Sequence, residues 1–242
     1  MKIIATDFDG TLNQNGIGKE KCEAIAAWRK AGNLFGIVTG RGFRSIYDVI
    51  KDTGIGYDFL ICNNGAVICD SKLNILTDTK CSEPLTADLF TDLFAAGCPL
   101  VNVDKDVSFR VYPTAEDGQY TIETMPCADG FNQISTFLKT EAEAAAVVEQ
   151  LKAKYGYALN PLQNGWCIDI VPQGVNKATG IYGLLKLVGA KYEDVIAVGD
   201  NLNDRDMIAE FHAYGMANGV DAIKQLADAI VYDITAVIRA ES

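Results

Sequence analysis

The chain has 242 residues, of which 49% are hydrophobic and 22% charged, so it can bury a sizeable core, and a disordered or fibrous protein is excluded. Its 21 Lys and Arg against 32 Asp and Glu give a formal net charge of −11, which repels nucleic acid and anionic lipid. With no clustered basic residues, no apolar run of about 18 residues and no secretory leader before the first Asp, we expect a cytoplasmic protein without nucleic-acid or membrane partners.

The first part of the chain alternates short apolar runs with helical patterns. The apolar run at residues 3–5 predicts a strand, and residues 19–30 predict a helix after a stretch of turn residues. A second strand is expected at 34–38, a helix through 46–50, and a third strand at 59–62. Strands that alternate with helices in this way are typical of a parallel sheet.

The middle of the chain follows a different pattern. Residues 101–103, 107–111 and 166–170 alternate apolar and polar side chains with a period of two, which is typical of half-buried antiparallel strands. Between them, the Ala-rich stretch 141–154 carries its apolar residues on one helical face. This region therefore predicts an α+β unit.

The alternation of helix and strand returns after residue 176. We expect a helix to residue 188, a buried strand at 195–198, a helix near 204–210 and a short strand that ends at 231. These elements continue the first sheet.

The predicted fold class is therefore α/β, with a doubly wound parallel-sheet core that carries an inserted α+β domain. We place the core at residues 1–82 and 173–242 and the insertion at residues 83–172. Both parts have ordinary domain sizes.

Polar residues follow three of the predicted core strands. They are the segments Asp7–Leu12, Thr39–Arg41 and Gly199–Asp204. Ligands of open α/β sheets bind at the carboxyl ends of parallel strands, so these segments are expected to line one site.

Four carboxylates would meet at that edge, because Asp7, Asp9, Asp200 and Asp204 all stand there. Carboxylates held so close together repel unless a cation neutralises them, and an oxygen-only set without His suits Mg²⁺ better than zinc or copper. In extended backbone, Asp7 and Asp9 project to the same side, so one could attack phosphorus and the other could exchange a proton.

These residues resemble the motifs of the haloacid dehalogenase superfamily of phosphotransferases, in particular its Cof-like branch with an α+β cap. Asp7–Leu12 resembles the first motif, Thr39 the second, Gly174–Lys177 the third and Gly199–Asp204 the fourth. The segment Tyr214–Asn218 is also similar to the Cof-like pattern, so the resemblance spans nearly the whole chain.

The resemblance implies a role for each motif residue. Asp7 would be the nucleophile that forms an aspartyl phosphate, and Asp9 would protonate the leaving oxygen and later activate water. Asp7, the backbone carbonyl of Asp9 and Asp200 would hold Mg²⁺, while Asp204 would orient metal-bound water.

The resemblance also implies a set of phosphate-binding residues. The Thr39 hydroxyl and the Gly40 amide would bind phosphoryl oxygens, Lys177 would neutralise charge and Asn203 would contact the phosphate. The family has Gly directly after this Lys, whereas here Ala178 and Thr179 stand before Gly180. We expect Lys177→Ala to keep the fold while weakening phosphate stabilisation.

The expected function is a Mg²⁺-dependent phosphatase acting on small phosphorylated metabolites, by resemblance sugar phosphates, through an aspartyl phosphate. A phosphomutase and a non-enzymatic phospho-acceptor regulator are the alternatives. Asp9 argues against the regulator, because a long-lived aspartyl phosphate has no need of a placed acid or base.

A further set of residues is weaker as candidates for substrate contacts. Four follow core strands and could reach the substrate: Arg41, Arg44, Asn63 and Asn64. Three lie in the insertion and could contact the leaving group: Arg110, Asn164 and Trp166. His212 is the single histidine, and we predict a structural role for it.

Overall fold

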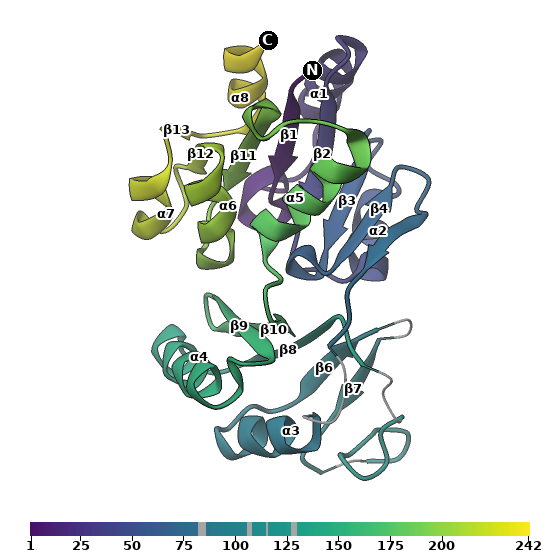
Figure 1. Cartoon of the computed structure of the whole chain (residues 1–242), viewed down its shortest axis with the longest axis vertical. Coiled ribbons are helices and arrows are strands. Elements are labelled where there is room, and N and C mark those ends of the chain that lie inside the picture. Colours follow the sequence, from purple (N-terminus) through teal and green to yellow (C-terminus); the bar gives the residue numbers. More distant parts are fainter. Residues whose placement is uncertain (82–85, 106–107, 115, 127–129) are drawn as a thin grey trace. The chain divides into compact units, whose positions relative to one another are not determined.

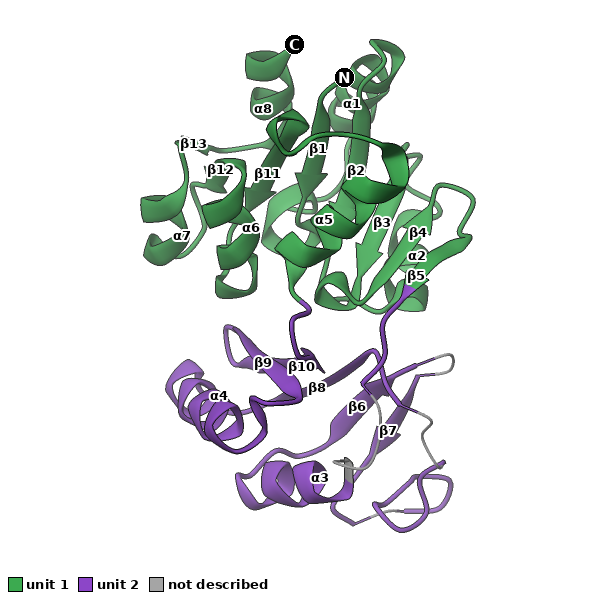
Figure 2. Cartoon of the chain, in the orientation of Figure 1, with its two compact units in different colours: residues 1–77, 176–242 green, residues 78–175 purple. Residues whose placement is uncertain are grey.

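The structure is a computed structural model that describes residues 1–81, 86–105, 108–114, 116–126 and 130–242 (Figure 1). It contains two compact units, one of residues 1–77 with 176–242 and the other of residues 78–175 (Figure 2). The sequence predicted domain boundaries after residues 82 and 172, a few residues from the divisions after 77 and 175 in the structure. Residue 82 lies outside the described residues.

The first unit is built on an eight-stranded sheet with the order β13-β12-β11-β1-β2-β3-β4-β5. Its strands are β1 (Ile3–Thr6), β2 (Leu34–Val38), β3 (Phe59–Cys62), β4 (Val67–Asp70), β5 (Ile75–Asp78), β11 (Val195–Gly199), β12 (His212–Met216) and β13 (Ala229–Val231). The six strands from β13 to β3 pair in parallel, and β4 pairs antiparallel with β3. The predicted parallel sheet is confirmed.

Helices cover both faces of this sheet. They are α1 (Lys19–Lys30), α2 (Phe43–Ile50), α5 (Lys177–Val188), α6 (Arg205–Glu210), α7 (Asp221–Leu226) and α8 (Ile234–Glu241). Ile3 packs in one apolar cluster with residues of α5, α6 and α7, and its neighbour Ile4 is equally buried. Because successive strand residues point to opposite faces, burial of both requires cover on both sides. The doubly wound fold class is therefore confirmed.

The second unit has a five-stranded sheet with the order β7-β6-β8-β10-β9, in which neighbouring strands pair antiparallel. Its elements are α3 (Thr86–Ala95), β6 (Val101–Asp104), β7 (Phe109–Val111), β8 (Gln133–Phe137), α4 (Glu141–Tyr155), β9 (Leu159–Asn164) and β10 (Cys167–Pro172). Apolar side chains of α3 and α4 share one core with this sheet. The predicted α+β character is confirmed, and Val107 of one expected strand lies outside the described residues. Within the described part of the chain, no helix is long and apolar enough to span a membrane.

His212 ties the last helix to the sheet. Its Nδ1 lies 3.0 Å from an Asp228 carboxylate oxygen and its Nε2 lies 2.9 Å from Glu241, the last residue of α8. Glu241 also accepts hydrogen bonds from the Tyr214 hydroxyl and from Lys2. Partial burial lowers the pKa of His212, but the two carboxylates raise it above its usual value overall.

We expect the stability contributed by His212 to depend on pH. A raised folded-state pKa means that the contribution is complete below the unfolded pKa of about 6.5 and disappears as pH rises through the folded value. His212→Gln should therefore lower the thermal midpoint more at pH 6 than at pH 9. Tyr214→Phe is the matched control: it removes a bond to the same Glu241, and burial raises the pKa of Tyr214 to about 12. Equal losses for His212→Gln at both pH values would contradict this role.

Candidate active site

Asp7 stands directly after β1, at the carboxyl end of the parallel sheet. Its N–H donates to the carbonyl of Val198 in β11 at 2.8 Å, which holds it between the two strands. The chain then turns over Phe8–Leu12, where the backbone of Asp9 and Gly10 is not helical, and the Leu12 N–H donates to the Asp7 carbonyl. Gly10 has φ +81°, and a Cβ there would collide with the Asp200 carboxylate, so this turn requires glycine.

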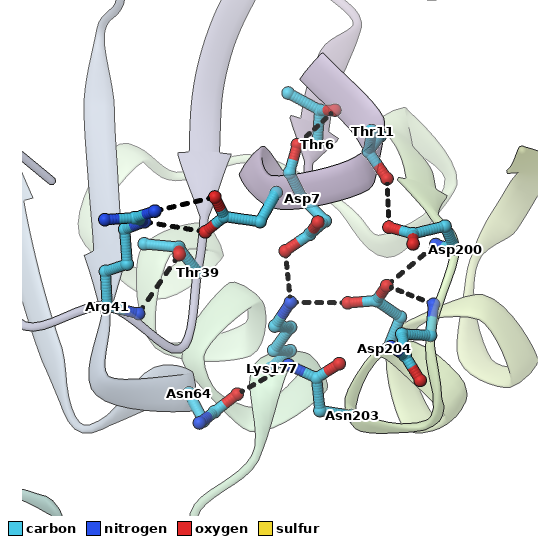
Figure 3. Close-up of polar contacts among 12 residues, drawn as sticks. Thr6, Asp7, Thr11, Thr39, Arg41, Asn64, Lys177, Asp200, Asn203 and Asp204 are labelled. Atoms are coloured by element: carbon cyan, nitrogen blue, oxygen red, sulfur yellow. Dashed lines mark hydrogen bonds and ion pairs between the residues drawn. The ribbon is translucent and has the colours of Figure 1, made fainter. Parts of the chain in front are cut away.

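Lys177 connects Asp7 with Asp204 at the centre of the site (Figure 3). Its Nζ donates to Asp7 Oδ1 at 2.6 Å and also to Asp204 Oδ1. Lys177 and Asp204 are fully buried, and Asp7 is nearly so. Burial lowers the pKa of Lys177, but the charges of Asp204 and Asp7 hold it above its usual value. The ammonium therefore stays charged and faces the Asp7 carboxylate.

The start of α5 places Lys177. Asn176 caps the helix, because its side chain accepts from the Thr179 N–H at 2.8 Å and its own N–H donates to the Thr179 hydroxyl at 2.9 Å. Thr179, which departs from the family pattern, thus serves the cap. The helix approaches closely enough that a Cβ at Gly180 would lie 2.8 Å from Gly65 Cα. This contact positions the first turn of α5 beside the end of β3.

Asp204 holds the loop that follows β11. Its Oδ2 accepts hydrogen bonds from the backbone N–H groups of Asp200 and Asn201 at 2.8 and 3.0 Å. Asp200 Oδ1 in turn accepts from the Thr11 hydroxyl at 2.7 Å. Both oxygens of Asp204 therefore contact donors of the protein itself.

Three carboxylates at this edge form a candidate metal centre. One oxygen each of Asp7, Asp200 and Asp204 lies within 4.8 Å of the others. Burial raises the pKa of Asp7 well above its usual value, against the effect of Lys177, and burial also raises the pKa of Asp200. These shifts reflect desolvated, mutually repelling charges, which a divalent cation would offset. Carboxylate oxygens are hard ligands, so the donor set fits Mg²⁺.

Asp9 lies apart from this group of carboxylates. Both of its oxygens contact the Arg41 guanidinium, with Nε to Oδ2 at 2.6 Å and Nη2 to Oδ1 at 2.8 Å. Three of the four carboxylates expected at this edge thus form one group, and Asp9 pairs with Arg41 instead. The reason is the turn after Asp7, because alternate residues share a side only in extended backbone.

Thr39 and Gly40 follow β2 beside this pair. The buried Thr39 hydroxyl accepts from the Arg41 N–H at 3.1 Å, and the Thr39 carbonyl accepts from the Asn64 N–H at 2.9 Å. Gly40 separates Thr39 from Arg41 on the same loop. The end of β2 and the end of β3 are thus joined through Thr39.

Asn203 contacts a residue that the sequence offered only as a weak candidate. Its side-chain amide donates to Asn64 Oδ1 at 3.2 Å, and both side chains are buried. Asn63 and Asn64 have φ of 50° and 51°, a left-handed conformation that Asn tolerates better than most residues. Two consecutive Asn residues after a strand are therefore a sequence signal for a left-handed turn at this position.

Two further polar residues shape the site and were not predicted. Thr11 holds Asp200, and the Asn218 side-chain amide donates to the Gly10 carbonyl at 2.9 Å. Both lie inside segments that resemble family motifs, which is the signal that could have found them. The insertion candidates belong to the second unit, where Arg110 donates to Asn102 at 3.1 Å and Trp166 is exposed.

We expect Lys177→Ala to destabilise the fold, contrary to the expectation from sequence. The substitution leaves two buried carboxylates without their counter-charge, which costs about 3–5 kcal/mol of unfolding free energy. Chemical denaturation of the metal-free protein measures this. Lys152→Ala breaks an exposed pair with Glu149 and should change stability little. Equal effects of the two substitutions would contradict a buried, charged Lys177.

Comparison with known proteins places this site in a family context. An HMP-PP phosphatase from Yersinia pestis is 23% identical over 248 residues, covering 93% of this chain and 86% of the relative. The fold is similar to that of a candidate HAD/COF-like hydrolase from Plasmodium vivax, with a TM-score of 0.83, 21% identity and coverage of 99% and 94%. It is also similar to a subclass IIB sugar phosphatase of the haloacid dehalogenase (HAD) superfamily, with a TM-score of 0.81, 19% identity and coverage of 99% and 98%.

A sequence profile for haloacid dehalogenase-like hydrolases matches residues 4–236. The match includes every motif at the carboxyl edge of the sheet, from Asp7 to Asn218. The motifs had predicted a hydrolase with a Cof-like fold, and this prediction is confirmed. The chain belongs to the haloacid dehalogenase-like hydrolase family.

Proposed function

We propose that this protein is a Mg²⁺-dependent phosphatase that hydrolyses small phosphate monoesters through a phosphorylated Asp7. The observation that carries the proposal is the buried Lys177 ammonium, which contacts Asp7 and Asp204 beside the Asp200 carboxylate. Sugar phosphates are the proposed substrate class. A similar fold belongs to a sugar phosphatase, and curated relatives include an HMP-PP phosphatase.

In the proposed first step, a carboxylate oxygen of Asp7 forms a bond to phosphorus as the bond to the leaving oxygen breaks. The leaving oxygen takes the electron pair of that bond and a proton from Asp9, so an alcohol departs. Lys177 supports this step because its Nζ lies 2.6 Å from Asp7 Oδ1, where negative charge gathers around the phosphoryl group.

In the second step, Asp9 takes a proton from water as the water oxygen bonds to phosphorus. The bond between Asp7 and phosphorus breaks, its electron pair returns to the carboxylate, and inorganic phosphate is released. Asp9 is half exposed, with 49% of its side chain accessible, which is compatible with exchange of protons with substrate and water.

The phosphoryl oxygens would be held by the Thr39 hydroxyl, the Gly40 amide, Lys177 and Asn203. Transfer of a phosphoryl group is catalysed largely by positioning and by neutralising charge. These groups come from the ends of β2 and β11 and from the start of α5, all at one edge of the sheet.

Asp7, Asp200 and the backbone carbonyl of Asp9 would hold the Mg²⁺ ion. When bound, the ion would supply positive charge against the phosphoryl oxygens in addition to that of Lys177, in a chain whose net charge is −11. The contacts of Asp204 support a role in holding Lys177 and the backbone of Asp200, in place of the expected role in orienting water.

We further propose that the α+β unit, residues 83–172 in the sequence-based division, acts as a cap that selects the leaving group. Its sheet and helices form a core of their own, so its surface can vary without disturbing the site residues of the first unit. The cytoplasmic location expected from the sequence stays a prediction.

The test is phosphate release from a panel of phosphorylated metabolites. We expect many turnovers per enzyme with Mg²⁺, loss of activity on chelation and recovery when Mg²⁺ is restored. Undiminished release in metal-free buffer would contradict the metal assignment. A single phosphorylation event without turnover would favour the phospho-acceptor, and an isomeric phosphate ester as product would favour the phosphomutase.

A further inference from the structure

Arg41 binds both carboxylate oxygens of Asp9, the residue proposed to protonate the leaving oxygen. The guanidinium binds Asp9 in a fork, at 2.6 and 2.8 Å, so both oxygens of Asp9 are engaged by Arg41. The pair is accessible to solvent, with 35% of the Arg41 side chain and 49% of the Asp9 side chain exposed. An ion pair this exposed is weak and can exchange partners.

Arg41 is also anchored where an incoming phosphoryl group would be bound. Its backbone N–H donates to the Thr39 hydroxyl, and its carbonyl accepts from the Asn63 N–H at 3.0 Å. The guanidinium carbon lies 5.7 Å from the ring centre of Phe8, the residue after Asp7. The backbone of Arg41 is thus tied to two strand ends, while its side chain reaches to the loop of the nucleophile.

A phosphoryl group is a strong competitor for this guanidinium. It offers two oxygens in the same fork geometry as a carboxylate and carries up to twice the charge. Among the cationic side chains near Asp7, Lys177 is buried and already paired with two carboxylates, whereas Arg41 is held by one exposed carboxylate.

We propose that Arg41 exchanges partners during the reaction: it binds Asp9 in the substrate-free enzyme and moves to the phosphoryl oxygens when substrate enters. Asp9 is thereby released to approach the leaving oxygen. Arg41 is then a phosphate-binding residue and also a positioning residue for Asp9. This inference rests on the proposed phosphatase function, because the exchange requires a bound phosphoryl oxyanion.

The test is a double-mutant cycle on the binding of inorganic phosphate, measured by calorimetry with Mg²⁺ present. The four proteins are wild type, Asp9→Ala, Arg41→Gln and the double variant. Asp9→Ala should tighten binding about threefold to fivefold, since an exposed ion pair no longer has to be broken. The same substitution should change affinity less than about twofold when Arg41 is already Gln. Arg41→Gln alone should weaken binding.

Simple repulsion between Asp9 and phosphate predicts the opposite pattern. Without Arg41, Asp9 loses its ion-pair partner and repels phosphate more strongly, so removing Asp9 would then help more in the Arg41→Gln background than in the wild type. A gain that is equal or larger in that background would overturn the exchange. Lys51→Gln, which removes the cation of an exposed ion pair with Asp48 of α2, is the matched control and should leave phosphate affinity unchanged.

The outcome also separates the two proposals. A wild-type protein that releases phosphate from esters but shows the repulsion pattern would refute the exchange and leave the phosphatase standing. A wild-type protein that neither binds phosphate nor releases it from any ester would refute both. Thermal melts of all four proteins, which should agree within a few degrees, exclude unfolding as the cause of any change.

Discussion

Asp7→Asn is expected to abolish phosphate release and the formation of a phosphoenzyme. The carboxamide carries no negative charge and cannot attack phosphorus, while its oxygen still accepts the hydrogen bond from Lys177. Lys177 also keeps its charged partner Asp204, so circular dichroism should stay near that of the wild type. Rapid quenching followed by intact-mass measurement detects the phosphoenzyme in the wild type and its absence in the variant.

Asp48→Asn is the control for this experiment. Asp48 is an exposed carboxylate of α2 that pairs with Lys51, and its loss should leave turnover intact. If Asp7→Asn released phosphate at the wild-type rate, water would be attacking the substrate directly and the covalent route would be wrong.

Asp9→Asn is expected to slow the release of basic leaving groups selectively. Proton donation is worth about 10²- to 10⁴-fold when the departing alkoxide is basic and much less when the leaving group is already a stable anion. A sugar phosphate should therefore suffer a loss of that order in the first step, whereas an activated aryl phosphate should suffer less.

The measurement is the pre-steady-state burst of alcohol release for both substrates, in wild type and variant. Steady-state turnover is unsuitable, because Asp9 is also proposed to activate water and both substrates can stall at the phosphoenzyme. Equal slowing of the two bursts would argue against the acid role of Asp9. Serial bursts with aryl phosphates of graded leaving-group pKa would extend the comparison.

Much of the fold follows from local patterns. Short apolar runs that end in polar residues predicted β1, β2, β3 and β11. Strands of a parallel sheet are buried on both faces, so their sequences are continuous apolar runs rather than alternating ones. The unpredicted β9 contains Pro161 and several amide side chains, which obscure the period-two signal. Its burial comes from pairing with β10 and packing against α4.

The sequence by itself determined which residues stand at the carboxyl edge of the sheet, since Asp7, Thr39 and Asp200 each follow an apolar run. Tertiary structure decided what those side chains contact. Lys177 is 170 positions from Asp7, and its complete burial between two carboxylates depends on how α5 packs. Asp9 turns toward Arg41 because the chain leaves extended geometry after Asp7. A sequence shows residue types and their periodicity. Desolvation and ion pairing depend on distances between side chains, and these distances arise only when distant segments pack together.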